Sequence, residues 1–237
     1  MTDFIRLDKA LSNMGAASRR EVKEAVKKGK ILVNGIPAKN SDMKITGEDE
    51  LVINGIPLKY KKYEYYMLNK PAGVISATTD SKERTVTDLI SGGRNDLFPV
   101  GRLDKDTVGL LVITNDGALA HELLSPVKHV KKTYFVRVEG RISEETDKKF
   151  SAGICIGSEQ FQPAELVILK NGEESEAEIT IYEGKFHQIK RMFEAVGNRV
   201  IYLKRLSMGN LRLDESLPEG NYRELSEDEL QQLKYRQ

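Results

Sequence analysis

A short stretch of the chain places charged residues and glycines directly ahead of an apolar run. Residues 101–109 read GRLDKDTVG, and the apolar residues 110–113 follow. That run is short, partly β-branched and followed by an Asn-Asp-Gly turn, which predicts a buried strand. A carboxylate on a tight loop beside a rigid strand is well placed to act as a nucleophile or base. On local grounds alone, Asp104 and Asp106 read equally well as ordinary turn residues.

Composition narrows the class of protein. The 237 residues are 39% hydrophobic and 31% charged, which is enough apolar material for one large domain or two small ones. No apolar stretch is long enough to span a membrane, and the N-terminus lacks the layout of a signal peptide. The single cysteine, Cys155, excludes an internal disulfide. We therefore expect a monomer in the reducing cytoplasm, with no membrane partner.

Charge is unevenly distributed along the chain. Residues 1–62 contain 13 Lys or Arg and 8 Asp or Glu, whereas residues 63–237 contain 24 and 28, although the net charge is only +1. This asymmetry predicts a basic N-terminal domain attached to a near-neutral body. The affinity for a polyanion is then expected to be concentrated in the N-terminal domain.

Two helices and two hairpins are predicted in this basic region. Residues 6–13 and 18–28 read as helices, and Ser18 with Glu21 forms a capping-box pattern at the start of the second. Arg19, Lys23 and Lys27 then share one helix face, which can follow a phosphate backbone or be merely solvated. Each of the Asn-Gly pairs at 34–35 and 54–55 follows an apolar run and predicts a hairpin turn.

The rest of the chain reads as strands with interspersed helices. Strands are expected at 65–68, 110–114, 133–139, 166–169, 177–182, 200–205 and 209–213, and helices at 85–90, 117–124, 187–196 and after Ser226. The acidic run 173–178 reads as a solvated loop entering a strand. We expect an α+β fold with a mixed, mostly antiparallel sheet flanked by helices, and a polar linker at 58–64.

Motifs for metals and nucleotide cofactors are missing from the sequence. No Cys/His cluster has metal-ligand spacing, and there is neither a P-loop nor a dinucleotide-binding glycine pattern. His121, His129 and His187 are scattered, and we expect each to be structural. The sequence therefore predicts a reaction that needs no metal and no cofactor.

Four stretches, in this order, resemble the motifs of the pseudouridine synthases in their RsuA-like branch. They are NKPAGV at 69–74, GRLDKDTVGLL at 101–111, KTY at 132–134 and EGKFHQIKRMF at 183–193. Near the N-terminus, RLDKAL at 6–11 and VNG at 33–35 resemble the S4 RNA-binding domain. The resemblance implies an S4-like domain at 1–59 and a pseudouridine synthase catalytic domain at 60–237.

The resemblance also implies a chemistry. Pseudouridine forms when the bond between N1 of uracil and C1′ of ribose breaks and C5 bonds to C1′. By resemblance Asp104 is the catalyst, which either adds covalently or first removes a sugar proton. Tyr134 then stacks on the detached uracil or relays a proton, and Lys190 holds the carboxylate ionised. Arg191 is the alternative cation, but consecutive helical residues point about 100° apart, so one of the two faces the site.

The RNA contacts and the target follow from the same resemblance. The expected RNA-binding residues are Arg102, Asn69 and Lys70 in the catalytic domain and Arg19, Arg20, Lys23, Lys27 and Lys28 in the S4-like domain. The resemblance favours position 516 of 16S ribosomal RNA, free or in an assembling small subunit. Relatives acting on 23S RNA carry Asn-Arg where this chain has His187-Gln188. A 23S synthase and a non-catalytic rRNA-binding or ribosome-assembly protein remain the alternatives.

Overall fold

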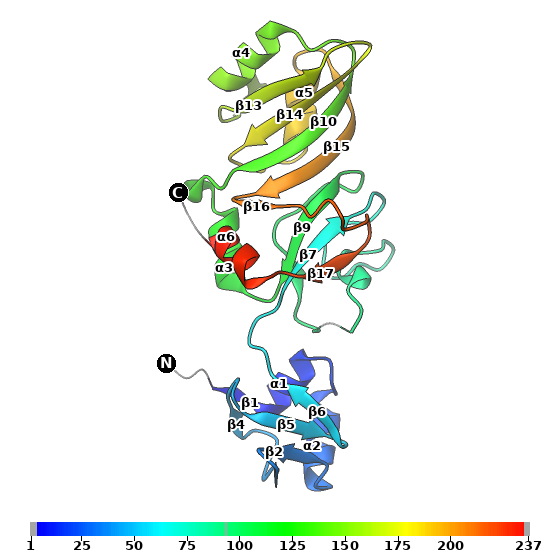
Figure 1. The fold of residues 1–237 in the computed structure, drawn as a ribbon, viewed down its shortest axis with the longest axis vertical. Coiled ribbons are helices and arrows are strands. Elements are labelled where there is room, and N and C mark those ends of the chain that lie inside the picture. Colours follow the sequence, from blue (N-terminus) through cyan, green and yellow to red (C-terminus); the bar gives the residue numbers. More distant parts are fainter. Residues whose placement is uncertain (1–3, 93, 235–237) are drawn as a thin grey trace. The chain divides into compact units, whose positions relative to one another are not determined.

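A computed structural model describes residues 4–92 and 94–234 of the chain. The chain forms two compact units (Figure 1). The first is Met1–Glu64 with Ile90–Leu97, and the second is Tyr65–Leu89 with Phe98–Gln237. The sequence analysis instead placed one boundary between residues 59 and 60. Among the described residues, no helix has the length and apolar character needed to cross a membrane.

The first unit contains two helices and two small sheets. The helices are α1 (Leu7–Asn13) and α2 (Arg19–Lys27). One sheet has the order β3-β2-β5-β6 and the other pairs β1 with β4. The strands are β1 (Ile5–Arg6), β2 (Ile31–Val33), β3 (Ile36–Pro37), β4 (Lys44–Ile45), β5 (Glu50–Ile53) and β6 (Ile56–Lys59). Strand β6 thus occupies the beginning of the expected linker at 58–64.

Local sequence signals account for the shape of this unit. The Ser18 hydroxyl accepts from the Glu21 N–H, and the Glu21 carboxylate accepts from the Ser18 N–H, so the expected capping box is present. Asn34 and Asn54, each followed by glycine, have φ of 53° and 52°. The hairpins β2–β3 and β5–β6 close at these pairs, because a two-residue turn of this type needs positive φ at both central positions.

The segment Ile90–Leu97 belongs to the first unit, although it lies within the catalytic domain in sequence. The buried guanidinium of Arg94 donates to the Asp96 carboxylate and to the carbonyl of Lys61. The Asn13 side chain donates to Asp96 at 2.9 Å, and the Asn95 N–H donates to the Asn13 carbonyl at 2.8 Å. These bonds attach the segment to the end of α1.

The second unit is built on a nine-stranded sheet. Seven of its strands follow the order β13-β14-β10-β15-β9-β7-β17, and the other two, β16 and β8, pair with β15 and β9. The β9–β15 pair is parallel and the other pairs are antiparallel, as the sequence predicts. The strands are β7 (Tyr65–Lys70), β8 (Phe98–Pro99), β9 (Val108–Thr114), β10 (Lys132–Glu139), β13 (Glu165–Lys170), β14 (Glu174–Ile181), β15 (Arg199–Met208), β16 (Leu211–Arg212) and β17 (Tyr222–Glu224). A separate hairpin pairs β11 (Cys155–Ile156) with β12 (Glu159–Gln160).

The α-helices of the second unit form two groups. The helices of this unit are η1 (Thr87–Leu89), α3 (Gly117–Leu124), η2 (Pro126–Lys128), α4 (Glu144–Ala152), α5 (Gln188–Glu194) and α6 (Glu227–Lys234). Helices α3 and α6 share a core with β7, β9 and β15, to which Leu119, Leu233 and Met67 contribute. Helices α4 and α5 meet where the rings of Phe150 and Phe193 lie 5.1 Å apart in an edge-to-face contact (Figure 1).

Two expectations about local structure are wrong. The acidic run 173–178 is not a loop, because β14 begins at Glu174 and alternate residues, Ser175 and Ala177, are buried. Glu176 on the opposite face pairs with Arg137 of β10. The helix expected at 85–90 is a single 3-10 turn, Thr87–Leu89. In both cases, pairing with other elements decides the backbone rather than local composition.

Gly109 allows two strands to approach at the base of the loop that carries Asp104. Its φ is +99°, and a Cβ at this position would lie 2.4 Å from the carbonyl oxygen of Arg205 and 2.8 Å from its nitrogen. Gly109 is paired with Arg205 in the parallel β9–β15 ladder. A side chain here would force β9 away from β15, because neither contact involves a flexible group.

We therefore expect Gly109→Ala to lower the free energy of unfolding by about 2–5 kcal/mol, because it combines a strained φ with a backbone clash. Urea unfolding followed by circular dichroism measures the change. Gly117→Ala is the matched control, since Gly117 has no neighbour within 4 Å of an added Cβ and lies in α3. Equal midpoints for the two variants would contradict the assignment of Gly109 as a packing glycine.

Candidate active site

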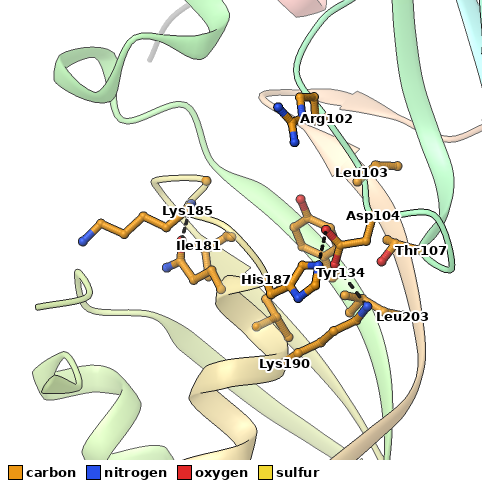
Figure 2. A pocket seen from close by; sticks show the side chains of 13 residues that line it. Arg102, Leu103, Asp104, Thr107, Tyr134, Ile181, Lys185, His187, Lys190 and Leu203 are labelled. Carbon is orange, nitrogen blue, oxygen red and sulfur yellow. Dashed lines mark hydrogen bonds and ion pairs between the residues drawn. The ribbon is translucent and has the colours of Figure 1, made fainter. Parts of the chain in front are cut away.

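Asp104 lies on the loop between β8 and β9, facing the N-terminal part of α5. Its Oδ2 is 3.1 Å from Nζ of Lys190, and the same ammonium donates a hydrogen bond of 2.6 Å to Oδ1 of Asp106 (Figure 2). The Asp106 side chain is 73% exposed, whereas that of Asp104 is only 25% exposed. One lysine thus holds two carboxylates, and of the two aspartates Asp104 is the one that lines the pocket.

The charges in this cluster are mutually stabilising. Burial lowers the pKa of Lys190, but the hydrogen bonds to Asp106 and Asp104 outweigh it, so the pKa is raised overall. Burial raises the pKa of Asp106, but the hydrogen bond and the positive charge of Lys190, with smaller contributions, together outweigh it, so the pKa is lowered overall. Lys190 is therefore an ammonium and Asp106 a carboxylate at neutral pH.

Arg191 points elsewhere, as the helical geometry requires. Its guanidinium is 2.7 Å from Glu159 and lies over the ring of Phe161 at 4.9 Å. Lys190 is consequently the α5 cation that reaches Asp104. The structure thus decides between the two neighbouring cations in favour of Lys190.

Tyr134 and Asp104 line the same pocket, although they come from different parts of the sheet. Tyr134 lies on β10, is almost fully buried, and is paired with Arg205 of β15. The pocket is completed by the apolar side chains of Leu103, Ile181 and Leu203 (Figure 2). An aromatic ring and an apolar wall beside a carboxylate and an ammonium suit a flat, polar-edged ligand such as a nucleobase.

Arg102 is exposed at the same pocket. Within residues 4–92 and 94–234 it forms no ion pair, unlike Lys185, which is close to both Glu159 and Glu183. Figure 2 shows Arg102 on the same loop as Asp104. Its guanidinium is therefore available to a phosphate or to the space left by an extruded nucleotide.

Asn69 and Lys70, which the resemblance implies are RNA-binding residues, lie inside the protein. The Asn69 side chain donates to the carbonyl of Leu217 at 2.7 Å, and its backbone bonds to Gly220 and Asn221. Asn69 thus anchors the turn before β17 to β7 through its amide nitrogen and its backbone, while its buried Oδ1 has no hydrogen-bond partner among the described residues.

Lys70 holds the loop of Asp104 from within. Its Nζ lies 2.9 Å from the carbonyl oxygen of Thr107, 3.1 Å from that of Asp104 and 3.3 Å from that of Lys105, with Pro71 as a fourth acceptor at 3.1 Å. Burial lowers its pKa to about 8, against the opposing influence of Asp106 and Asp104. An ammonium with three hydrogens therefore shares them among the carbonyls of one loop.

His187 is a pocket residue that the sequence analysis read as structural. Its Nε2 is 3.6 Å from Oδ1 of Asp104 (Figure 2). His187 is the N-cap residue of α5, and its φ is 50°. Gln188 is buried instead, and its side chain donates to Glu183. The signal in the sequence was the spacing, because His187 precedes Lys190 by three residues, about one helical turn.

The basic residues of α2 form an exposed face on the first unit. Arg19, Arg20, Lys23, Lys27 and Lys28 are all exposed, while Val22 and Val26 are buried. Arg20 is 3.7 Å from Glu24 one turn away, which is a weak surface pair. The helix is thus amphipathic, as its pattern predicts, with a surface of positive charge.

The position of Lys70 leads to a test that separates support of the loop from RNA contact. We expect Lys70→Met to lower the free energy of unfolding by about 2–4 kcal/mol, because the buried carbonyls lose their donor. Lys105→Met on the same loop, where the exposed lysine pairs with Glu83, changes it by less than about 0.5 kcal/mol. Thermal or urea unfolding gives both values. Unchanged stability with weaker, less salt-dependent RNA binding in Lys70→Met would instead support the RNA-contact interpretation.

Comparisons with known proteins identify the family of this chain. The family model described as RNA pseudouridylate synthase matches residues 64–195, and that of the S4 domain matches residues 5–51. A crystal structure of a pseudouridylate synthase superimposes with a TM-score of 0.68 at 35% identity, covering 97% of this chain and 99% of that one.

Curated relatives span nearly the whole chain. The uncharacterized RNA pseudouridine synthase YtzG of Bacillus subtilis is 48% identical over 95% of this chain and 97% of its own length. Ribosomal large subunit pseudouridine synthase B of the same species is 40% identical over 97% and 95%. Ribosomal small subunit pseudouridine synthase A of Yersinia pestis is 37% identical over 95% and 97%. The chain therefore belongs to the RNA pseudouridine synthase family, as an enzyme with an S4 domain preceding its catalytic domain.

Proposed function

We propose that this enzyme converts one uridine of 16S ribosomal RNA to pseudouridine, with Asp104 as the catalytic group. The observation that carries the assignment of Asp104 is its position in a pocket lined also by Tyr134 and Lys190. These three side chains come from three separate segments, yet they surround one space. Such convergence is typical of a catalytic site and is not needed for the stability of a loop.

The reaction is an isomerisation and balances without a redox partner. The N1–C1′ bond of uridine breaks, the uracil turns, C5 bonds to C1′, and the hydrogen lost from C5 is balanced by one gained at N1. Both routes open to Asp104, addition to the nucleotide and removal of a sugar proton, begin with an ionised carboxylate. Lys190 balances that charge and fixes the orientation of the carboxylate through its contacts with both aspartates.

The remaining pocket residues hold the base while it is detached. The ring of Tyr134 offers a stacking surface, and its hydroxyl is the group suited to relay a proton. Arg102 at the rim is suited to hold a phosphate of the extruded nucleotide, because it is exposed and no described side chain pairs with its charge.

His187 supports the choice of 16S RNA. Both residues that distinguish the branches line the pocket. His187 lies 3.6 Å from Asp104, whereas Gln188 is buried and bonded to Glu183, so a target preference encoded at this pair acts most directly through the histidine. The relatives at 40% and 37% identity carry large-subunit and small-subunit names, respectively, so overall similarity favours neither target.

Asp104→Asn tests the catalyst. Because the amide is nearly isosteric but cannot act as nucleophile or base, we expect turnover to fall more than about 1,000-fold with little change in folding or RNA affinity. Asp106→Asn is the matched control on the same loop, contacting the same lysine, and we expect it to lose less than about tenfold. A tritium-release assay on ribosomal RNA labelled at uridine C5 measures turnover. Retained activity in Asp104→Asn would exclude Asp104 as the catalyst.

A pseudouridine map of ribosomal RNA tests the target. In a strain that lacks the gene, we expect one pseudouridine to disappear from 16S RNA and none from 23S RNA. The wild-type gene should restore it, and the gene carrying Asp104→Asn should not. Loss confined to 23S RNA would assign the enzyme to the large subunit, which is the target in the name of the 40% identical relative.

We also propose that the basic face of α2 binds the RNA backbone. Replacing Arg19, Arg20 and Lys23 by Glu should weaken binding and reduce the steepness of log affinity against log salt by about 2–3. The reason is that a variant with fewer phosphate contacts releases fewer counterions from the RNA when it binds. The control reverses Lys148, Lys149 and Lys170, which are exposed on the second unit. Filter binding over a salt series provides the slopes, and equal slopes for the two triple variants would show that the face is only solvated.

A further inference from the structure

The loop between β14 and α5 is fixed by buried polar bonds. The side chain of Gln188 donates to Oε1 of Glu183 at 2.9 Å and accepts from the Lys185 N–H at 3.0 Å. The same Glu183 oxygen accepts from the Gln162 N–H at 2.9 Å. Because Gln188 and Glu183 are both buried, these bonds hold the intervening residues in one conformation.

Phe186 lies exposed on this fixed loop. Its side chain is 69% exposed, and its ring stacks on His187 with 3.8 Å between centroids and 17° between planes. His187 in turn is 3.6 Å from Asp104. The two stacked rings therefore extend from the carboxylate of Asp104 in the pocket to the solvent.

An exposed aromatic ring in this position contributes little to the core. One face of Phe186 is covered by His187, and most of the ring remains accessible. Since the loop is already ordered, a second ring can stack on Phe186 without the entropic cost of fixing a mobile side chain. Arg102, which forms no ion pair among the described residues, lines the same pocket as His187 and can attract an incoming ring attached to a phosphate.

A nucleobase next to the target uridine matches these requirements. Extrusion of a uridine removes a stacking partner from its neighbours. Proteins that bind unpaired RNA commonly replace that partner with an aromatic side chain, and every base has a face that can stack. Because His187 contacts Asp104 directly, a base on Phe186 lies close along the strand to the uridine in the pocket.

We propose that the Phe186–His187 pair is a stacking platform for a base that flanks the uridine being isomerised. The proposal deepens the proposed function, because it requires RNA in the pocket, but it does not depend on whether the RNA is 16S or 23S. Phe186 is then a binding residue and His187 connects the platform to the catalytic carboxylate.

The chain contains no tryptophan, so Phe186→Trp introduces a single tryptophan at the platform, whose fluorescence can be excited selectively over that of the nine tyrosines. We expect a short oligouridylate to quench this fluorescence as it binds, and an abasic oligomer of equal length not to do so, because stacking needs a base. Val127→Trp, at a side chain 81% exposed on η2, is the control and is expected not to be quenched by either probe. Anisotropy of a dye on each oligomer shows independently that it is bound.

Quenching of Phe186→Trp by the abasic oligomer to the same extent, or none by bound oligouridylate, would overturn the proposal. These readouts need no ribosomal target, so they are independent of the 16S assignment. On the ribosomal transcript that the wild type modifies, we expect Phe186→Ala to raise KM about 5- to 150-fold with kcat nearly constant, from a stacking energy of about 1–3 kcal/mol per base. Phe186→Trp should reverse most of this increase, and an unaltered KM in Phe186→Ala would also overturn the platform.

Discussion

Three backbone carbonyls of the loop that carries Asp104 converge on the buried ammonium of Lys70. Lys70 ends strand β7 and is paired with Gly109 of β9, so its side chain lies at the root of this loop. Two of these carbonyls also accept from backbone N–H groups, that of Asp104 from Thr107 and that of Lys105 from Gly73. The ammonium ties all three carbonyls to the end of β7, and it thereby fixes the position of Asp104.

Buried contacts between strands bring the distant segments of the site together. At Gly109 the strands β9 and β15 approach closely, and the buried Arg205 of β15 donates to the carbonyl of Leu110 at 2.6 Å. Arg205 is also the partner of Tyr134 in the β10–β15 ladder. The sheet thus places the phenol beside the loop, and α5 brings Lys190 from the other side. Hydrogen-bonded segments therefore carry all three of the proposed catalytic side chains.

Charge and stacking are divided between separate parts of the second unit. Lys190 joins Asp104 and Asp106 in the pocket, whereas Lys185 and Arg191 are paired with Glu159. Because all three cations are already paired with carboxylates, Arg102 is the pocket cation that forms no ion pair among the described residues. Specific contact with RNA then depends on aromatic surfaces, for which rigid rings are suited because they lose little entropy on binding.

The sequence by itself determined the features whose causes are local. The capping box at Ser18 and the Asn-Gly turns need partners only a few residues away, and helical geometry lets only one of Lys190 and Arg191 face the site. The motif spacing likewise identified the family and the site of Asp104. These features are readable because a short segment contains all the atoms that decide them.

Only the tertiary structure decided the features whose partners are far along the chain. Lys70 reads as a free cation until the carbonyl of Thr107, 37 residues away, is seen to accept from it. His187 reads as structural until the fold places it against Asp104, and the acidic residues after Glu173 read as a loop until β14 pairs with β10. Burial and pairing override local polarity in each case, because the cost of leaving a buried polar group without a partner exceeds the preference of a residue type for the surface.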